Sequence, residues 1–485
     1  MTDNFRTGNS PNFQEGGLRG FFSKNSALAF IVAGSAWFIV GTLYGLFSAI
    51  HLMAPEFFNN IPALVFGRVR PSHVNTVLYG FVVTTLIGLG MYYTPALLKT
   101  KLWSEPLGWV SLFLWNITVL SGPVFFSMGM SQGREYTEYL WPFDVTFMIA
   151  IVTIIINLVM TIIHRKEYVL YVSIWYFVAS FIWIGGSYFI GNVMWRPSTG
   201  ALPGILDSIF LWFYAHALPG LLLTPLAIGA AYFIIPRVTK TPLFSHTLSI
   251  VGFWTLVTFY SHIGGHHLLQ APIPHWLKTM SVVDSMMMFI PVIIVIVNLW
   301  MTMRGRGNLI MADPAAKWVA MGLIWYLIVG AQGSIQSIPQ IQKVTHFNNW
   351  TVAHAHIAVL GFSGFIALGG VWHVIPLITR RKLYSQRLAN LQFGLVMIGL
   401  TGFFLVLTIA GLIQGEAWYN GETVYRVLPQ LQPYMILRTI FGLFIISGAL
   451  VGFYNLIRSI RKPKEYPYIS ASHAVIIETQ KNPEI

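Results

Sequence analysis

The sequence is short of two things that most chains of its length contain. It has no cysteine in 485 residues, which excludes a disulfide framework, a cysteine-bound iron–sulfur cluster and a covalently attached c-type haem in this chain. It is also poor in charge, because Asp, Glu, Lys and Arg make up only 9% of it, against about a quarter in globular domains. A chain that is 55% hydrophobic with so little charge is expected to lie in a membrane.

Long apolar runs recur along the whole chain. A run of roughly 20 residues crosses a hydrocarbon layer of about 30 Å as a helix. The sequence therefore predicts an all-α, polytopic membrane protein with twelve transmembrane helices in a domain at 26–460, with polar tails at 1–25 and 461–485. The predicted spans are 26–51, 73–97, 105–129, 141–163, 168–190, 205–235, 246–270, 276–302, 314–336, 349–377, 388–414 and 433–460.

Lys and Arg are distributed unevenly between the two sides of this predicted bundle. With the N-terminus inside, 21 of the 29 fall in inner segments and 8 in outer ones. This bias follows the positive-inside rule, so both termini are expected to be cytoplasmic. The net charge of +13 is then a signal of topology, and no nucleic-acid partner is predicted. No repeat of 20–50 residues is evident.

Six histidines lie within predicted spans in grouped patterns, at a depth where ionisable side chains are costly and mark functional sites. They come from four spans far apart in the sequence, three running inward and one outward, and all six fall in the outer half of the predicted membrane. Scattered packing residues would not share one depth. The six are His73, His216, His266, His267, His354 and His356.

The stretch “NWTVAHAH” places two of these histidines two residues apart. Side chains two apart on a helix differ in direction by about 200°, so His354 and His356 point to nearly opposite sides and can bind two different metals. Haem iron needs only one or two axial imidazoles, which makes haem the expected metal holder on each side. The alternative, a hydrogen bond between helices, explains a single buried histidine better than it explains this pattern.

The stretch “FYSHIGGHHL” supplies a second group of ligands. Adjacent His266 and His267, with His216 from a neighbouring helix, give three imidazoles, a set suited to copper with positions left open for a small substrate. Tyr260 precedes His267 by seven residues and is expected on the same helix face, where a phenol can supply an electron and a proton. Simple aromatic packing is the alternative for Tyr260.

These residues resemble the haem–copper oxidase superfamily, and within it the catalytic subunit (subunit I) of the cbb3-type cytochrome c oxidases, the C family. The motifs that carry the resemblance are “GRVRPSHVN”, “SQGREYTEYLWP”, “YAHALPG”, “FYSHIGGHHL” and “WTVAHAH”. The resemblance implies a respiratory terminal oxidase in the bacterial inner membrane that reduces O2 to water and translocates protons. Its electrons would come from membrane-anchored c-type cytochrome subunits.

The resemblance also implies two b-type haems. His73 and His356 would be the two axial ligands of a low-spin haem b, and His354 the proximal ligand of a high-spin haem. Arg70 and Arg438 resemble family residues near the haem propionates, where a guanidinium can bind a carboxylate with two hydrogen bonds.

Copper facing the high-spin haem is the third metal that the resemblance implies. His216, His266 and His267 would hold it, and Tyr260 would be the tyrosine that this family links covalently to His216. Glu135 matches a family carboxylate that helps to hold a structural calcium near the propionates.

Protons must reach this site from the inner side, and no Lys or Glu lies deep in the sixth to eighth spans. Hydroxyl groups are therefore the expected carriers, with packing hydrogen bonds as the alternative for each. Spacing puts one candidate on the Tyr260 face of the seventh span, and two follow His216 along the sixth in positions that resemble the single proton path of the family. The proposed members are Ser249, Thr224, Tyr232 and Asn298.

One departure and two alternatives remain. Gln332 stands where the family commonly carries a glutamate, and a glutamine cannot gain or lose that proton. Nitric oxide reductases of the same superfamily place non-haem iron at the copper position with a nearby glutamate and lack the tyrosine, whereas this chain has Gly220 and Tyr260. A histidine-dependent transporter would show broken helices in two related halves, and no such symmetry is found.

Overall fold

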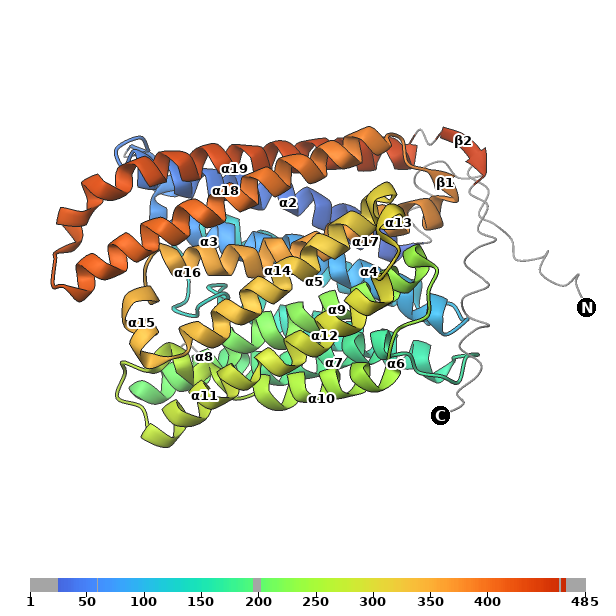
Figure 1. Ribbon diagram of the computed structural model, residues 1–485, viewed down its shortest axis with the longest axis horizontal. Helices are drawn as coiled ribbons and strands as arrows, with labels where there is room; N and C mark the ends of the chain where they lie inside the picture. The colour runs from blue at the N-terminus through green and yellow to red at the C-terminus, as the bar shows by residue number, and fades with distance from the viewer. Residues whose placement is uncertain (1–24, 59, 195–201, 462–463, 468–485) are drawn as a thin grey trace, which may run out of the picture.

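The computed structural model describes residues 25–58, 60–194, 202–461 and 464–467. Figure 1 shows long helices running side by side along one axis of an elongated bundle. The only strands among these residues are β1 (Arg381–Lys382) and β2 (Lys464–Pro467), which pair antiparallel at one end. The all-α membrane fold is confirmed. The predicted tails at 1–25 and 461–485 fall almost entirely outside the described residues.

Eleven helical segments of the described chain are long and apolar enough to cross a membrane, and each overlaps one predicted span. Six are single helices: α2 (Ser26–Met53), α5 (Glu105–Ser127), α6 (Trp141–Ile163), α14 (Pro314–Gln336), α18 (Gln386–Tyr419) and α19 (Val424–Arg461).

Five spans are composite. They are α3, η2 and α4 (Phe66–Asn75, Thr76–Val83, Thr84–Leu97); α7 and η3 (Val172–Tyr188, Phe189–Val193); α8, η4 and α9 (Ile205–Ala217, Leu218–Leu223, Thr224–Thr239); α11 and α12 (His275–Met287, Phe289–Met303); and α16, η6 and α17 (Asn349–His356, Ile357–Gly364, Phe365–Thr379). Shorter pieces are η1 (Pro62–Leu64), α13 (Gly307–Ala312) and α15 (Pro339–Thr345).

The seventh predicted span is the exception. The sequence predicts one helix over 246–270, but α10 (His246–Tyr260) ends after 15 residues. A turn follows, and then a 3₁₀-helix, η5 (Ile263–Leu268). The predicted count of twelve long helices is therefore not confirmed. The interruption falls just before the adjacent histidines, which places it beside the site described below.

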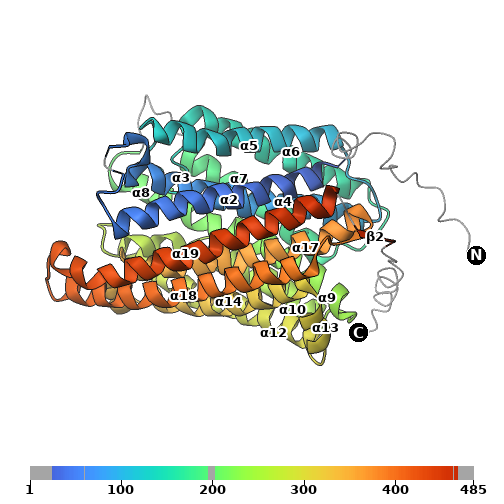
Figure 2. The same ribbon diagram turned by 90° about the horizontal axis from the view of Figure 1, so that it is seen from above.

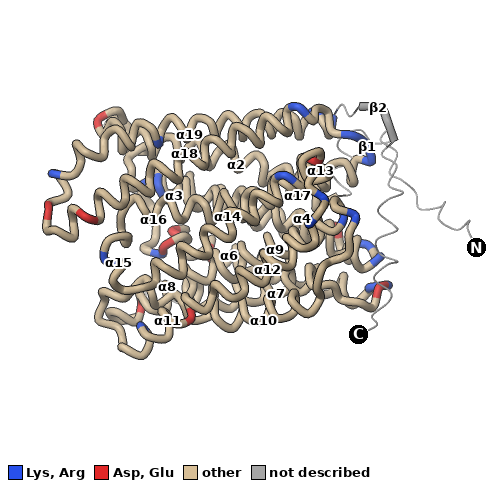
Figure 3. Tube along the Cα trace, in the orientation of Figure 1, with Lys and Arg blue, Asp and Glu red and all other residues tan. Residues whose placement is uncertain are grey.

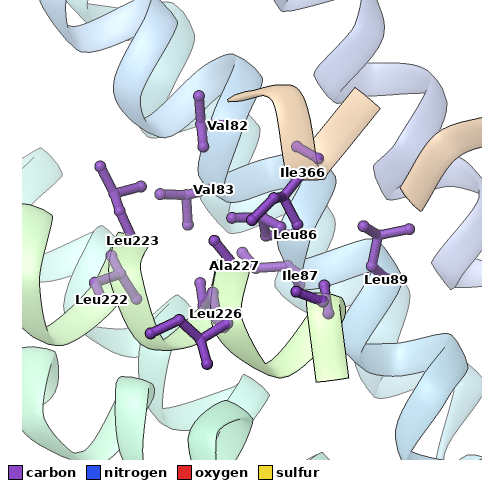
Figure 4. Close-up of a cluster of buried hydrophobic side chains, with 14 of the residues drawn as sticks. Val82, Val83, Leu86, Ile87, Leu89, Leu222, Leu223, Leu226, Ala227 and Ile366 are labelled. Atoms are coloured by element: carbon purple, nitrogen blue, oxygen red, sulfur yellow. The ribbon is translucent and has the colours of Figure 1, made fainter. Parts of the chain in front are cut away.

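Three composite spans form the centre of the bundle. In Phe66–Leu97, Ile205–Thr239 and Asn349–Thr379, 89%, 94% and 89% of the most apolar stretch is buried, against 33–56% in the other eight. Figure 4 shows their side chains meeting: Val83 and Leu86 from the first, Leu223 and Leu226 from the second, and Ile366 from the third. The other helices surround this trio, with their apolar outer faces turned outward.

Each central span contains a π-helical stretch directly after its histidines. The stretches η2, η4 and η6 follow His73, His216 and His356 within a few residues. A π-helical stretch adds a residue to the turn and often marks a functional site. The three central spans therefore share the same local backbone structure next to their histidines.

A sequence repeat marks the far ends of the same three helices. The stretches “PALLKTKLWS” (95–104), “PRVTKTPLFS” (236–245) and “PLITRRKLYS” (376–385) lie about 140 residues apart. In each, a basic residue in the left-handed conformation ends the central helix: Lys99 at φ 51°, Lys240 at φ 55° and Arg380 at φ 54°. In each, the final serine then caps the next helix by accepting a backbone N–H three residues on.

An asparagine clamps each of these serines from a neighbouring helix. Asn455 accepts the Ser385 N–H at 3.1 Å and donates to the Ser385 carbonyl at 2.9 Å. Asn157 makes the same two bonds with Ser104, and Asn298 makes them with Ser245. The chain therefore contains three related units. Their period of about 140 residues lies outside the range of 20–50 residues in which no repeat is evident.

The two ends of the bundle differ in charge. Lys and Arg gather at the end where α4, α9 and α17 finish (Figure 3), here called the basic end. At the opposite end α18 and α19 form a hairpin that extends past the other helices, as Figures 1 and 2 both show. The histidines of the central spans lie toward that opposite end, because they precede the π-helical stretches.

The clamp predicts a loss of stability. In Asn455→Ala, the backbone N–H and C=O of Ser385 lose their partners, and each unpaired buried group costs about 1–3 kcal/mol. We expect a lower melting temperature for the purified protein, measured by thermal unfolding in detergent. Asn420→Ala, at the exposed end of α18, is the matched control and should melt as the wild type does. Equal melting of all three proteins would contradict the clamp.

Candidate metal centre

One large cavity lies between the central spans of the described chain and brings the six histidines together. It is lined mostly by apolar side chains, with the imidazoles as its main polar groups. The histidine residues on its wall are these six, His73, His216, His266, His267, His354 and His356, together with His346. Four spans far apart in the sequence thus present imidazoles to one space.

His73 and His356 face each other across one part of this cavity. Their ring centroids are 6.1 Å apart and their planes differ by 20°. Two metal–imidazole bonds of about 2 Å each, made to one ion between the rings, put the centroids about 6 Å apart. The spacing therefore fits two axial ligands of a single iron, as in a six-coordinate haem.

Hydrogen bonds on the far side of these two rings set their protonation. His73 Nδ1 lies 2.7 Å from the Gly41 carbonyl oxygen of α2, and His356 Nδ1 lies 2.8 Å from the Val352 carbonyl oxygen. A carbonyl oxygen can only accept, so each Nδ1 carries the proton and each Nε2 is left with a free lone pair. Such outer bonds orient metal-binding imidazoles and raise their basicity.

His354 lies on the other flank of the same helix. Its ring is nearly parallel to that of Trp350, with 5.7 Å between centroids, and its Nδ1 lies 3.3 Å from Gln332 Oε1. His356 pairs with His73, while His354 has no imidazole opposite it at that spacing among the described residues. The binding of separate metals by these two histidines stays a prediction.

The remaining three histidines form a compact cluster. The possible ligand atoms of His216, His266 and His267 all lie within 4.8 Å of one another, and this is the only such group of three among the described residues. His216 Nδ1 and His267 Nε2 are 2.7 Å apart. Three converging imidazole nitrogens, with no carboxylate among them, are a donor set suited to copper.

The hydroxyl of Ser285 fixes the tautomer of His266. The hydroxyl of Ser285 donates to the Ser281 carbonyl oxygen, so its lone pairs accept from His266 Nδ1 at 2.7 Å. His266 therefore turns an unprotonated Nε2 toward the cluster. Gln342 holds the backbone of the same residue, because its side-chain amide donates to the His266 carbonyl oxygen at 2.7 Å.

The break in the seventh span brings His266 and His267 into place. At Gly264 the chain passes so close to α8 that a Cβ atom would lie 2.3 Å from the Trp212 carbonyl oxygen. The Trp212 ring stacks on His267 with 3.9 Å between centroids and 12° between planes. The expectation that Tyr260 and His267 share one helix face is therefore wrong, because the helix ends between them.

Tyr260 nevertheless reaches the cluster, through His216. The two ring centroids are 5.3 Å apart with 21° between the planes. The phenol ring occupies the space in which a side chain at position 220 would lie, since a Cβ atom on Gly220 would fall 1.6 Å from a Tyr260 ring carbon. A tyrosine ring in this position therefore requires a glycine at 220.

Of the two arginines predicted near haem propionates, one lies on the cavity wall. Arg438 lines the wall at 9% exposure, its guanidinium lies 5.5 Å above the Phe403 ring, and its Nε has no hydrogen-bond partner. A buried guanidinium with an unpaired N–H fits an anionic group of a bound ligand, such as a haem propionate. Arg70 is more exposed and pairs with Glu135 at 2.7 Å.

The predicted path residues are only partly brought together. Asn298 Nδ2 donates to the Tyr232 hydroxyl at 3.4 Å. The hydroxyls of Ser249 and Thr224 donate to carbonyl oxygens of their own helices, at His246 and Pro219. Thr224 also lines the cavity.

Sequence reasoning missed three residues here. Tyr326 of α14 lines the cavity, and its buried hydroxyl has no hydrogen-bond partner in the described part of the chain. Trp212 contacts His267 as described, and its place four residues before His216 was the one signal in the sequence. Glu138 is buried at 9% exposure and accepts from Asn75 Nδ2 at 2.6 Å.

Comparisons with known proteins agree with this geometry. Residues 25–444 match the protein family described as Cytochrome C and Quinol oxidase polypeptide I. The chain is 30% identical over 444 residues to a “Cytochrome c oxidase subunit 1 homolog” of Agrobacterium tumefaciens (strain T37), covering 89% of this chain and 82% of that one. It is 28% identical over 451 residues to the “Cbb3-type cytochrome c oxidase subunit CcoN1” of Stutzerimonas stutzeri, covering 90% and 95%.

The fold also matches a solved structure. The structure described as “Cryo-EM structure of a heme-copper terminal oxidase dimer provides insights into its catalytic mechanism” superposes with a TM-score of 0.78 at 16% identity. The match covers 94% of this chain and 88% of that chain, and it shows a shared fold.

The contact between Gly220 and Tyr260 predicts the effect of a single methyl group. In Gly220→Ala the new Cβ overlaps the phenol ring, so Tyr260 must move away from His216 while the three imidazoles remain in place. We expect normal copper content by metal analysis, together with a displaced Tyr260 in an experimental structure. Gly186→Ala, where an added Cβ meets no atom within 4 Å, is the control. An unmoved Tyr260 in the variant would contradict the close contact.

Glu138 predicts a pH dependence. It lies between α5 and α6, outside the spans, and burial raises its pKa from 4.5 to about 7 despite the Asn75 hydrogen bond. The folded protein then holds a proton between these values that the unfolded chain has lost, so stability falls as pH rises through this window, by about 3 kcal/mol at most. Thermal unfolding from pH 4 to 8 should show this fall in the wild type and less of it in Glu138→Gln. Identical curves would contradict it.

Proposed function

The chain belongs to the Cytochrome C and Quinol oxidase polypeptide I family, and on that premise we propose that it is the catalytic subunit of a cbb3-type respiratory oxidase that reduces O2 to water. The observation that carries the proposal is the three-imidazole cluster with Tyr260 packed against Gly220. The curated relatives named as cytochrome c oxidase subunits support it.

The histidines divide between three metals. His73 and His356 would hold a low-spin b-type haem between them, and their 6.1 Å centroid spacing supports this assignment. His354 would hold a high-spin b-type haem through the Nε2 that its Nδ1 contact with Gln332 leaves free. Copper takes the remaining three imidazoles, in the cluster formed by His216, His266 and His267.

The bound haems and copper supply the electrons and the metal positions at which oxygen is reduced. The protein residues orient these groups and exclude water. The outer hydrogen bonds of His73, His356 and His266 hold each ring in the tautomer that metal binding needs. Tyr260 places a phenol O–H beside His216, where it can give up a proton and an electron to the cluster. The covalent link between these two rings belongs to the same proposal.

Protons approach from the basic end along the central spans. Tyr232 and Asn298 form one step, and Tyr326 offers a buried hydroxyl on the cavity wall for the next. Thr224 lies on α9, the helix of Tyr232, and Ser249 lies on α10; their hydroxyls can turn from the backbone carbonyls to pass a proton. Asn298 also clamps Ser245, so it fixes the start of the path as well as serving it.

Electrons must come from another chain. This sequence has no cysteine with which to attach a c-type haem, so we assign that role to membrane-anchored c-type cytochrome subunits. Coupling of the reaction to proton translocation is part of the same assignment.

The membrane topology completes the proposal. The basic end faces the cytoplasm of a bacterial inner membrane, with both termini on that side, because Lys and Arg concentrate there. The short helix α10, continued by η5, makes the twelfth crossing next to α12. Arg438 binds a haem propionate, while Arg70 and Glu135 lie at the edge of the same region, where Glu135 helps to hold a calcium ion.

Substitution of Tyr260 by phenylalanine tests the function. Tyr260→Phe removes only the hydroxyl, so haem and copper contents should be unchanged while oxygen consumption falls by about 100-fold or more, as is typical when a group that donates a proton in the reaction is lost. Oxygen-electrode assays of the purified complex, with metal analysis, make the measurement. Tyr454→Phe, on the exposed face of α19, is the control and should keep full activity.

Two results would contradict the proposal. Non-haem iron in place of copper, together with nitric oxide turnover, would assign the chain to the nitric oxide reductases. If the purified protein shows no haem bands in a reduced-minus-oxidised spectrum, a histidine-dependent transporter would be the better explanation of its buried histidines.

A further inference from the structure

The Nδ1 of His354 has a more distant hydrogen-bond acceptor than the Nδ1 atoms of His73 and His356. His73 and His356 give their Nδ1 protons to backbone carbonyl oxygens at 2.7 and 2.8 Å. His354 has only the side-chain amide oxygen of Gln332, at 3.3 Å. Gln332 lies in the last two turns of α14, and the residue after it, Gly333, has its Cβ position 3.6 Å from the His354 ring.

The chemistry of the contact fixes the orientation of the amide. His354 can bind iron through Nε2 only if Nδ1 carries the ring proton, and that proton needs an acceptor. Gln332 must therefore present Oε1, and not its NH2 group, to the ring. A neutral amide oxygen accepts this proton without drawing it away, whereas a carboxylate at the same place would pull the ring toward imidazolate.

We propose that Gln332 is a positioning residue for the high-spin haem, which holds His354 in one tautomer while keeping its imidazole a weak, neutral donor to iron. This inference rests on the proposed function. A weakly donating proximal imidazole favours the ferrous state of the iron, because a more basic ligand stabilises the ferric state. The choice of amide at position 332 then sets the potential of this haem without contact with any metal.

Two substitutions at position 332 should shift the reduction potential of the high-spin haem in opposite directions. Gln332→Glu keeps the length and the acceptor but adds charge, and should favour the ferric high-spin haem about tenfold, a negative shift of about 59 mV for a one-electron couple. Gln332→Leu removes the acceptor and should shift the potential the other way. Spectroelectrochemical titration of the purified complex makes the measurement.

The iron–histidine vibration distinguishes a change in the bond between His354 and the iron from a general electrostatic effect of the added charge. The iron–histidine stretching band of the reduced protein, read by resonance Raman spectroscopy, should rise in Gln332→Glu and fall in Gln332→Leu. Gln336→Glu is the matched control, because it adds the same carboxylate to the same helix four residues further on, at a cavity-lining position without the contact to His354 that Gln332 makes. The band should not move in that variant.

The outcomes separate this inference from the proposed function. Wild-type protein with both haems, and with bands and potentials that are the same in Gln332→Glu and Gln332→Leu, would overturn the role of Gln332 and leave the oxidase assignment intact. A band that moves equally in Gln336→Glu would overturn it too, by showing a field effect. If Gln332→Leu fails to retain haem, Gln332→Glu still decides the question. Wild-type protein without a high-spin haem would refute the proposed function itself.

Discussion

The site depends on the hydrogen bonds that Nδ1 of its buried imidazoles makes, because these leave Nε2 free to bind a metal. In an apolar cavity an N–H without an acceptor is costly, so the fold supplies a short-range acceptor to three of the rings: a carbonyl of α2 for His73, a carbonyl one turn back for His356, and a serine hydroxyl for His266. Each bond leaves a lone pair aimed inward. Metal affinity is thus built into the helix packing, before any metal is bound.

Packing at the opposite ends of the helices keeps these bonds in register. Three central spans, each with a π-helical stretch, meet in one apolar core (Figure 4), and three serine–asparagine clamps fix the helices around them at the basic end. Because the three units have the same local structure, a unit that differs from the other two points to a local function. The second unit alone is followed by a short helix, α10, and its interruption lets His266 and His267 turn toward His216.

Composition and apolar runs predicted the helical membrane fold and eleven of the spans, because length and hydropathy decide whether a segment crosses a membrane. Depth along the spans placed six histidines at one level. Helical periodicity failed at Tyr260 and His267, since it assumes a continuous helix where Gly264 approaches Trp212. Outer partners such as Gly41 and Ser285 could not be predicted, because they lie on other helices, 32 and 19 residues away from the rings they bind.

Anomalous X-ray diffraction at the iron and copper absorption edges tests the central claim most directly. The account predicts one iron between His73 and His356, a second iron at His354, and a single copper among His216, His266 and His267. An iron signal at the three-histidine position, or no signal between the paired rings, would contradict it.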